Sequence, residues 1–255
     1  MNIFLNAEMA EGFKSRSQVS RIVTEAWAGK ELYCPECLAP NISATPNNTR
    51  AVDFVCKCCQ ASFQLKSSRS NFYNNVPDGA YKTMLSAINE SRAPNLLLMT
   101  YSPTRWTVND LIWIPYFALT EHVIIPRKPL SVNARRAGWV GCNINLSRIA
   151  TTARISMVVG GHIVDRHTVN SRYKKISPLK ELKPRARGWT MAVLNEILKS
   201  GWKEFTTRQA YCFEEALHMQ FPGNSNVRAK IRQQLQVLRD LKILDHLSQG
   251  CWRYR

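Results

Sequence analysis

The chain has 255 residues, enough for one large domain or two modest ones, and it can bury a core without disulfides. Lys and Arg number 35 against 18 Asp and Glu, and residues 127–187 alone carry 14 basic and 2 acidic side chains. A basic excess this concentrated predicts contact with a phosphate backbone. An anionic membrane is the alternative partner, but no transmembrane run, amphipathic helix or lipidation signal accompanies the basic segment.

The first 16 residues lack the charged leader and long apolar run of a secretory signal, so we expect a cytoplasmic protein. Its 8 cysteines then need an explanation other than disulfides. Residues 17–28 place Val19, Ile22 and Val23 at helical spacing. This pattern predicts an amphipathic helix that carries Glu25 at the edge of its apolar face.

Four cysteines are arranged as two CxxC pairs, Cys34 with Cys37 and Cys56 with Cys59, separated by 18 residues. Two such pairs at this separation are typical of a tetrahedral structural zinc site, whereas a redox CxxC motif would need only one pair. Cys58 leaves open which two thiols of the second pair bind, although the CxxC spacing favours Cys56 and Cys59.

The second cysteine pair lies between two expected strands, residues 51–55 and 62–66. Side chains alternate along a strand, so Gln64 and Lys66 share a face that Asp53 can reach from the neighbouring strand. An acid, then an acid or amide, a spacer and a lysine is the pattern of the PD-(D/E)xK nucleases. The alternative is a solvated hairpin with a salt bridge.

The nuclease pattern predicts a magnesium site in this hairpin. Oxygen ligands would come from Asp53, Gln64 and the backbone of Leu65, and Lys66 would orient the attacking water. Gln64 contributes no charge, which weakens magnesium binding unless another carboxylate compensates. Glu25 is the candidate for this auxiliary acid; otherwise it is a surface glutamate.

The next segments complete an α/β core. Residues 67–77 are polar and predict a loop, residues 78–90 a helix, and residues 95–102 and 110–118 two strands. Helix, strand pair, helix, strand and strand match the αβββαβ order of a restriction-endonuclease-like core, with the tetracysteine site embedded in it.

The basic segment begins at Arg127. Arg135 and Arg136 suit phosphate or guanine contacts, and Trp139, beside a glycine, can press on a base edge or methyl group. Core packing is the alternative role for this tryptophan. Residues 171–187, with two prolines and seven basic residues, indicate a solvated or DNA-tracking linker.

Residues from Gly188 onward predict three helices, over 190–200, 206–219 and from Asn226, followed by a short hairpin that ends at Arg255. This order is typical of a winged helix, whose third helix enters the major groove. A protein-binding winged helix is the alternative. The expected DNA contacts are Arg228, Arg232, Gln233 and Arg253, and we place the domain boundary between residues 183 and 184.

Together these segments resemble the DpnI-like family of methyl-directed type II restriction endonucleases over nearly the whole chain. The resemblance is carried by TEAW, CPEC, DFVC, FQLKS, DGAYKTM, RKPLSVNARRAGWVGCNI, RGWT and NVRAKIRQQLQVLRD. It implies a nuclease domain (1–183) with structural zinc and a winged-helix domain (184–255). Asp53 and Lys66 fall on the family's catalytic acid and lysine, Gln64 falls where the family has glutamate, and Trp139 falls on the tryptophan that meets the adenine methyls.

The resemblance further implies Mg²⁺-dependent hydrolysis of double-stranded DNA at G-m6A-T-C sites, within a prokaryotic restriction system, and we expect a cytoplasmic monomer. Two alternatives are a methyl-DNA-binding regulator whose nuclease site has decayed at Gln64, and a structure-specific nuclease of the same fold.

Overall fold

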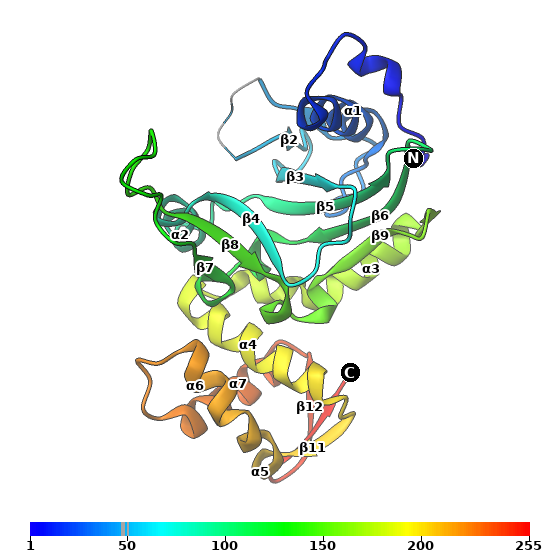
Figure 1. The fold of residues 1–255 in the computed structure, drawn as a ribbon. Helices are drawn as coiled ribbons and strands as arrows, with labels where there is room; N and C mark the ends of the chain where they lie inside the picture. Colours follow the sequence, from blue (N-terminus) through cyan, green and yellow to red (C-terminus); the bar gives the residue numbers. More distant parts are fainter. Residues whose placement is uncertain (47–48, 50) are drawn as a thin grey trace. The chain divides into compact units, whose positions relative to one another are not determined.

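The computed structural model describes residues 1–46, 49 and 51–255 (Figure 1). The chain forms two compact units, each assembled from separate segments. The first comprises Met1–Tyr73, Ala93–Tyr116 and Ala153–Lys174, and the second comprises Asn74–Arg92, Phe117–Thr152 and Lys175–Arg255.

A seven-stranded mixed sheet, in the order β1-β2-β3-β5-β6-β9-β10, forms the first unit. Only β3 and β5 pair in parallel, and the other neighbours within this sheet are antiparallel. The central strand β5 carries the apolar run Leu96–Met99 and is buried at every residue except the last, as expected for a strand inside a sheet. The strands are β1 Ser43–Ala44, β2 Phe54–Val55, β3 Ser62–Ser68, β5 Asn95–Ser102, β6 Thr107–Ile114, β9 Ile155–Val159 and β10 His162–Ile163.

Helix α1, Arg16–Glu31, belongs to the same unit and buries Val23, Trp27 and Ala28 on one side. This is the amphipathic helix that the spacing predicted. Thr24, also on this side, donates its hydroxyl to Ser67 of β3 at 3.1 Å. The contact holds one face of α1 beside the C-terminal end of β3, and α1 lies next to β3 in Figure 1. A short 3-10 turn, Ala7–Ala10, precedes α1, and α3, Arg166–Ile176, begins in this unit.

A three-stranded antiparallel sheet, ordered β4-β8-β7, opens the second unit. Its strands are β4 Asn75–Ala80, β7 Ile124–Pro126 and β8 Gly141–Asn145, and helix α2 is Tyr81–Asn89. The predicted helix over residues 78–90 is therefore wrong at its start, because Asp78 pairs with Cys142 of β8. Short 3-10 turns occupy 116–118, 121–123, 146–148 and 151–153.

The C-terminal part of the second unit is a winged helix. Helix α7 buries Val227, Ile231, Leu235 and Leu238, the stripe that the sequence predicted. The three-stranded sheet β11-β13-β12 closes the fold. The elements of this C-terminal part are η6 Ser177–Glu181, α4 Pro184–Ser200, β11 Glu204–Thr206, α5 Thr207–Ala210, η7 Tyr211–Phe213, α6 Glu214–Gln220, α7 Val227–Asp240, β12 Leu244–Ser248 and β13 Cys251–Tyr254.

Residues 171–187 do not form the expected linker. The end of α3, a 3-10 turn and the first turn of α4 cover most of this segment. Pro184 is the first residue of α4, and proline is well tolerated there because its missing N–H would have no partner within the helix. The two prolines therefore start helical elements rather than interrupt them. The fold as a whole confirms the predicted mixed α/β class with a C-terminal winged helix.

Candidate active site and metal centre

The two CxxC segments form turns with the same backbone hydrogen bonds. In the first, the Cys34 N–H donates to Ala39 at 2.9 Å and Leu38 donates to the Cys34 carbonyl at 2.9 Å. In the second, Cys56 and Gln60 make the equivalent bonds at 2.8 and 2.9 Å. Leu38 and Gln60 both adopt positive φ, 63° and 61°. Each turn therefore directs two thiols to one side.

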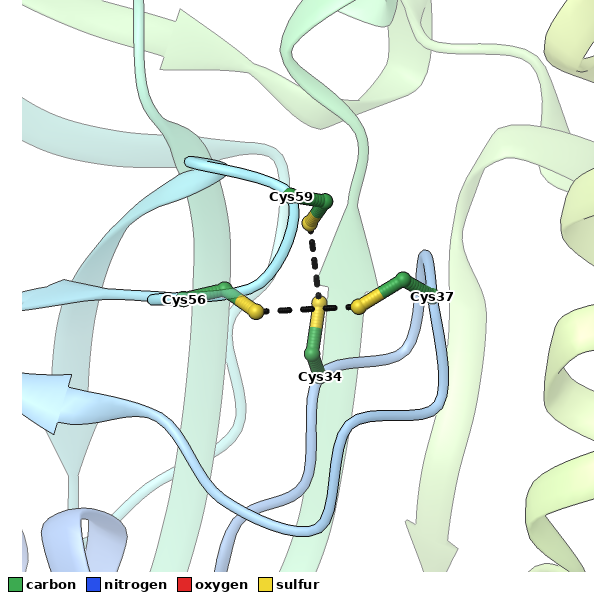
Figure 2. Close-up of side chains that lie close together, drawn as sticks. All are labelled: Cys34, Cys37, Cys56 and Cys59. Atoms are coloured by element: carbon green, nitrogen blue, oxygen red, sulfur yellow. Dashed lines mark hydrogen bonds between the residues drawn. The ribbon is translucent and has the colours of Figure 1, made fainter.

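The four thiols converge on one point, and Figure 2 shows the sulfur atoms facing one another. The Sγ atoms of Cys34, Cys37, Cys56 and Cys59 lie within 4.8 Å of one another, with two pairs at 3.6 Å. A tetrahedral zinc with Zn–S bonds of about 2.3 Å holds its sulfurs about 3.8 Å apart, so the cluster matches that ion. Cys58 lies outside the cluster, as the CxxC spacing favoured.

Burial makes the cluster unfavourable for thiolates unless a cation is present. It raises the pKa of Cys34 and, to about 12, that of Cys59. Cys37 differs, because the Ala39 N–H and neighbouring thiols outweigh burial and lower its pKa to about 7.

The first cysteine turn is tied to the rest of its unit through Glu36. Its carboxylate accepts hydrogen bonds from Asn95 of β5 at 2.9 Å and from the Tyr173 hydroxyl of α3 at 3.0 Å. Asn170 donates to the backbone oxygens of Pro35 and Glu36 at 3.0 and 2.9 Å. The first cysteine turn is therefore held by the central strand and by a helix.

The second cysteine turn connects β2 to β3, as the sequence predicted. Phe54 pairs with Phe63 across this antiparallel hairpin. Asp53 immediately precedes β2 and donates its N–H to the Phe63 carbonyl at 2.8 Å. Its carboxylate Oδ2 accepts the Leu65 N–H at 2.8 Å. Asp53 is thus fixed against the segment of β3 that carries Gln64 and Lys66.

One open pocket of about 370 Å³ gathers the residues of the predicted nuclease pattern. Asp53, Gln64 and Lys66 line it together with Leu65. Phe63 directly precedes Gln64 on β3 and is completely buried on the opposite face of the strand. The alternation along the strand therefore separates the apolar anchor from the polar face, as expected.

Helix α1 supplies the opposite wall of this pocket. Ser17, Ser20, Arg21, Thr24 and Glu25 line it, and Ser67 of β3 completes it. The Thr24–Ser67 hydrogen bond holds α1 against β3, so Glu25 lines the same pocket as Asp53. Arg21, which sequence reasoning missed, donates its Nε to Glu25 at 2.7 Å. The i, i+4 spacing of the two residues was the available signal.

Trp139 lies at the end of the long connection between β7 and β8, in the second unit. It is half-buried, and its ring edge covers Gly141, where an added Cβ would come within 2.9 Å of the ring. The guanidinium of Arg136 lies 4.7 Å from the ring centroid. Arg135 is exposed on the same connection. The tryptophan is therefore neither a core residue nor fully exposed.

The predicted DNA contacts of the winged helix lie on its surface. Arg228, Arg232 and Gln233 are exposed on α7, and Arg253 is exposed on β13 beside Glu204, at 2.9 Å. Two of them, Arg228 and Arg232, contact a residue that the sequence did not single out, Tyr211.

Tyr211 holds two arginines of α7. Its hydroxyl accepts from Arg232 at 2.7 Å, and both Arg228 and Arg232 lie within 5.9 Å of its ring. Arg228 is also paired with Glu214 at 2.7 Å. The Thr206–Gln209 capping box that the sequence predicted is present at the start of α5, whereas Asn226 does not cap α7 through its side chain.

A winged helix with arginines on the exposed face of α7 supports DNA binding. A family model described as DpnI, Dam-replacing family, matches residues 1–182. A second, described as DpnI_C, Dam-replacing HTH domain, matches residues 185–254. The chain therefore belongs to the DpnI family of methyl-directed restriction endonucleases, and it is a nuclease by membership. In the part of the chain that the structure describes, no helix combines the length and apolar character needed to cross a bilayer.

Proposed function

We propose that this protein is a Mg²⁺-dependent type II endonuclease that hydrolyses double-stranded DNA at G-m6A-T-C sites. The observation that carries the proposal is the convergence of Asp53, Gln64 and Lys66 on one pocket, in the PD-(D/E)xK pattern. We assign the cutting to residues 1–183 and a separate DNA contact to residues 184–255. We further propose that it acts as a cytoplasmic monomer in a prokaryotic restriction system.

The donor atoms of this pocket suit a hard divalent cation. Asp53 offers a carboxylate, Gln64 an amide oxygen, the Leu65 backbone a carbonyl, and Glu25 an auxiliary carboxylate. When bound there, Mg²⁺ supplies positive charge that neutralises the developing charge on the phosphate and leaving oxygen. Lys66, on the same strand face as Gln64, orients and polarises the attacking water. Asp53 is pre-positioned for its role because Leu65 donates to its carboxylate.

We propose that Cys34, Cys37, Cys56 and Cys59 bind a structural zinc. Four thiolates fill a tetrahedral coordination sphere and leave no position for substrate. The second cysteine turn connects β2 and β3, so the ion holds the hairpin that carries Asp53 and Lys66. Metal binding at such sites contributes of order 10 kcal/mol to folding. A hairpin with only two paired residues on β2 depends on a contribution of this kind.

Methyl recognition requires more than one contact. One buried methyl contributes about 0.8 kcal/mol, so two methyls on a fully methylated site give roughly tenfold to twentyfold discrimination. Trp139, with Arg135 and Arg136 beside it, supplies one apolar surface next to cations. Arg228, Arg232, Gln233 and Arg253 form the second contact, on the winged helix. Two readers together provide the discrimination that one contact lacks.

Digestion of one plasmid, prepared from adenine-methylating and from non-methylating hosts, tests the proposal in the presence of Mg²⁺. We expect fragments only from the methylated plasmid, and none with Asp53→Ala, which should still bind DNA. Cutting of both plasmids alike, or of branched unmethylated DNA, would instead support a structure-specific nuclease.

A second candidate function follows from Gln64, which lacks the charge of the family's glutamate. A methyl-DNA-binding regulator with a decayed nuclease site would bind the methylated plasmid and release no fragments at any Mg²⁺ concentration. The same digestion, with a parallel binding assay, separates the two functions.

A further inference from the structure

The charges around the candidate nuclease pocket balance to zero. Four charged side chains line it, with Asp53 and Glu25 negative and Arg21 and Lys66 positive. Gln64 adds no charge, whereas a glutamate there would leave the pocket with a net charge of −1. A divalent cation would therefore enter a site whose two carboxylates are already balanced by two cationic side chains.

Arg21 is the cation that lies in direct contact with one of these carboxylates. Its Nε donates to Glu25 at 2.7 Å, one helical turn along α1. The Arg21 side chain is 65% exposed and that of Glu25 34%, so this ion pair is accessible to solvent and weak. Neither side chain is locked by burial, and both can change partner by rotation.

The backbone beneath this pair is fixed. Thr24, adjacent to Glu25, is buried, and its single hydroxyl proton is shared between the Ser20 carbonyl at 2.8 Å and the Oγ of Ser67 in β3 at 3.1 Å. Helix α1 can therefore stay against β3 when the exposed Arg21 and the half-buried Glu25 change rotamer. Exchange of ion-pair partners needs no movement of the helix.

We infer that Arg21 is a catalytic residue that exchanges partners with the metal: Glu25 leaves Arg21 to ligate the divalent cation, and the released guanidinium binds the scissile phosphate. The inference rests on the proposed nuclease function. The planar guanidinium matches two phosphate oxygens, and its charge adds to that of Lys66 at the reacting group. Gln64 makes this exchange important in this chain, because Glu25 is the second carboxylate of the pocket.

The exchange predicts opposite effects of Arg21 on two measurable steps. Arg21 competes with the cation for Glu25, so Arg21→Ala should tighten cation binding, by roughly twofold to fivefold for an exposed ion pair. The same change removes a charged donor from the phosphate and should slow cleavage by roughly tenfold to a hundredfold. A residue that only supports the fold would weaken both steps together.

The experiment measures Mn²⁺ binding to the DNA-free, zinc-loaded full-length protein from the free Mn²⁺ signal in electron paramagnetic resonance. Single-turnover cleavage of methylated plasmid is measured in parallel. The variants are Arg21→Ala, Arg21→Lys, Glu25→Gln and Asp53→Ala. Arg16→Ala is the matched control, because Arg16 is exposed on the same helix and lies outside the pocket-lining set.

Arg21→Ala should bind Mn²⁺ more tightly than the wild type and cut more slowly, Arg21→Lys should lie between them, and Arg16→Ala should match the wild type. In a Glu25→Gln background, most of the gain in Mn²⁺ affinity from Arg21→Ala should disappear.

If Asp53→Ala abolishes Mn²⁺ binding while Arg21→Ala leaves it unchanged or weaker, the exchange is wrong and the proposed function stands. Tighter Mn²⁺ binding with unchanged cleavage overturns the phosphate contact. If Asp53→Ala still binds Mn²⁺ as the wild type does, the proposed metal site itself is wrong.

Discussion

Gln64→Glu tests most directly how the neutral side chain at position 64 affects Mg²⁺ binding and cleavage. It places a carboxylate at position 64, where the resemblance to the family implies a glutamate, on the strand face that Lys66 shares, without changing the length of the side chain. We expect the Mg²⁺ concentration needed for half-maximal cleavage to fall, with the cleavage rate at saturating Mg²⁺ retained or raised.

The magnitude follows from the charges in the pocket. Two unit charges 4 Å apart interact by about 1 kcal/mol in water, so a new carboxylate gains about 2 kcal/mol with a divalent cation. Repulsion from Asp53, which is fixed beside Leu65 by its 2.8 Å hydrogen bond, is present with and without the cation and therefore cancels in the binding free energy. The gain of about 2 kcal/mol corresponds to roughly thirtyfold tighter binding, and lower solvent screening raises this value.

The assay is cleavage of methylated plasmid over a Mg²⁺ titration, with Mn²⁺ binding to DNA-free protein as the second measurement. Gln18→Glu is the matched control, because Gln18 is exposed on α1 and lies outside the pocket-lining set. A Gln64→Glu protein that needs as much Mg²⁺ as the wild type, or more, would show that position 64 is not a metal ligand.

Four further outcomes are expected. Cys34→Ser should lose zinc, solubility and activity together; a normally folded, zinc-free protein measured by metal analysis and circular dichroism would contradict the structural zinc. Trp139→Ala should reduce the preference for methylated over unmethylated DNA by roughly tenfold in competition binding, with Trp139→Phe retaining part of it. Arg228→Ala should lower the slope of log affinity against log salt by about 0.9 if Arg228 contacts one phosphate; an unchanged slope would exclude that contact. Burial, aided by the charge of Arg148, lowers the pKa of His122 from 6.5 to about 3. Its contribution to stability is therefore complete above pH 6.5 and lost as the pH falls toward 3, at up to about 1.4 kcal/mol per pH unit. Urea unfolding at pH 7 and pH 5 should show this loss in the wild type and not in His122→Phe.

Local patterns in the sequence predicted the elements whose contacts are local or strictly periodic. The buried stripe of α7 follows from apolar residues three and four apart, and the Thr206–Gln209 capping box from a fixed spacing. The cysteine cluster was predictable because each CxxC turn fixes its own thiol geometry. The hairpin between β2 and β3 then follows from the position of the second turn.

The errors arose where distant segments decide the local structure. Asp78 and Gly79 indicated a helix start, but β4 pairs with β8, more than 60 residues later in the chain, and a register shift lies between Asp78 and Ala80. The prolines of residues 171–187 indicated a linker because proline breaks a helix interior, yet Pro184 starts α4.

The wall of the candidate site could be predicted only in part. Glu25 was visible as an acid on a helix edge, but the docking of that helix depends on Thr24 and Ser67, which carry no distinctive motif. The role of Arg21 needs this docking, and so does the charge balance of the pocket. Tyr211 was missed for the same reason, because its two arginine partners come from a separate helix.

The Trp139 ring lies so close to Gly141 that the residue at one of these positions limits which residues the other can carry. Any side chain at 141 displaces the ring, because even a methyl group would meet it at 2.9 Å. A library of variants selected for relaxed methyl preference should therefore yield substitutions at the glycine as well as at the aromatic residue. Conversely, a larger residue at 141 should be tolerated only where a smaller one has replaced the tryptophan.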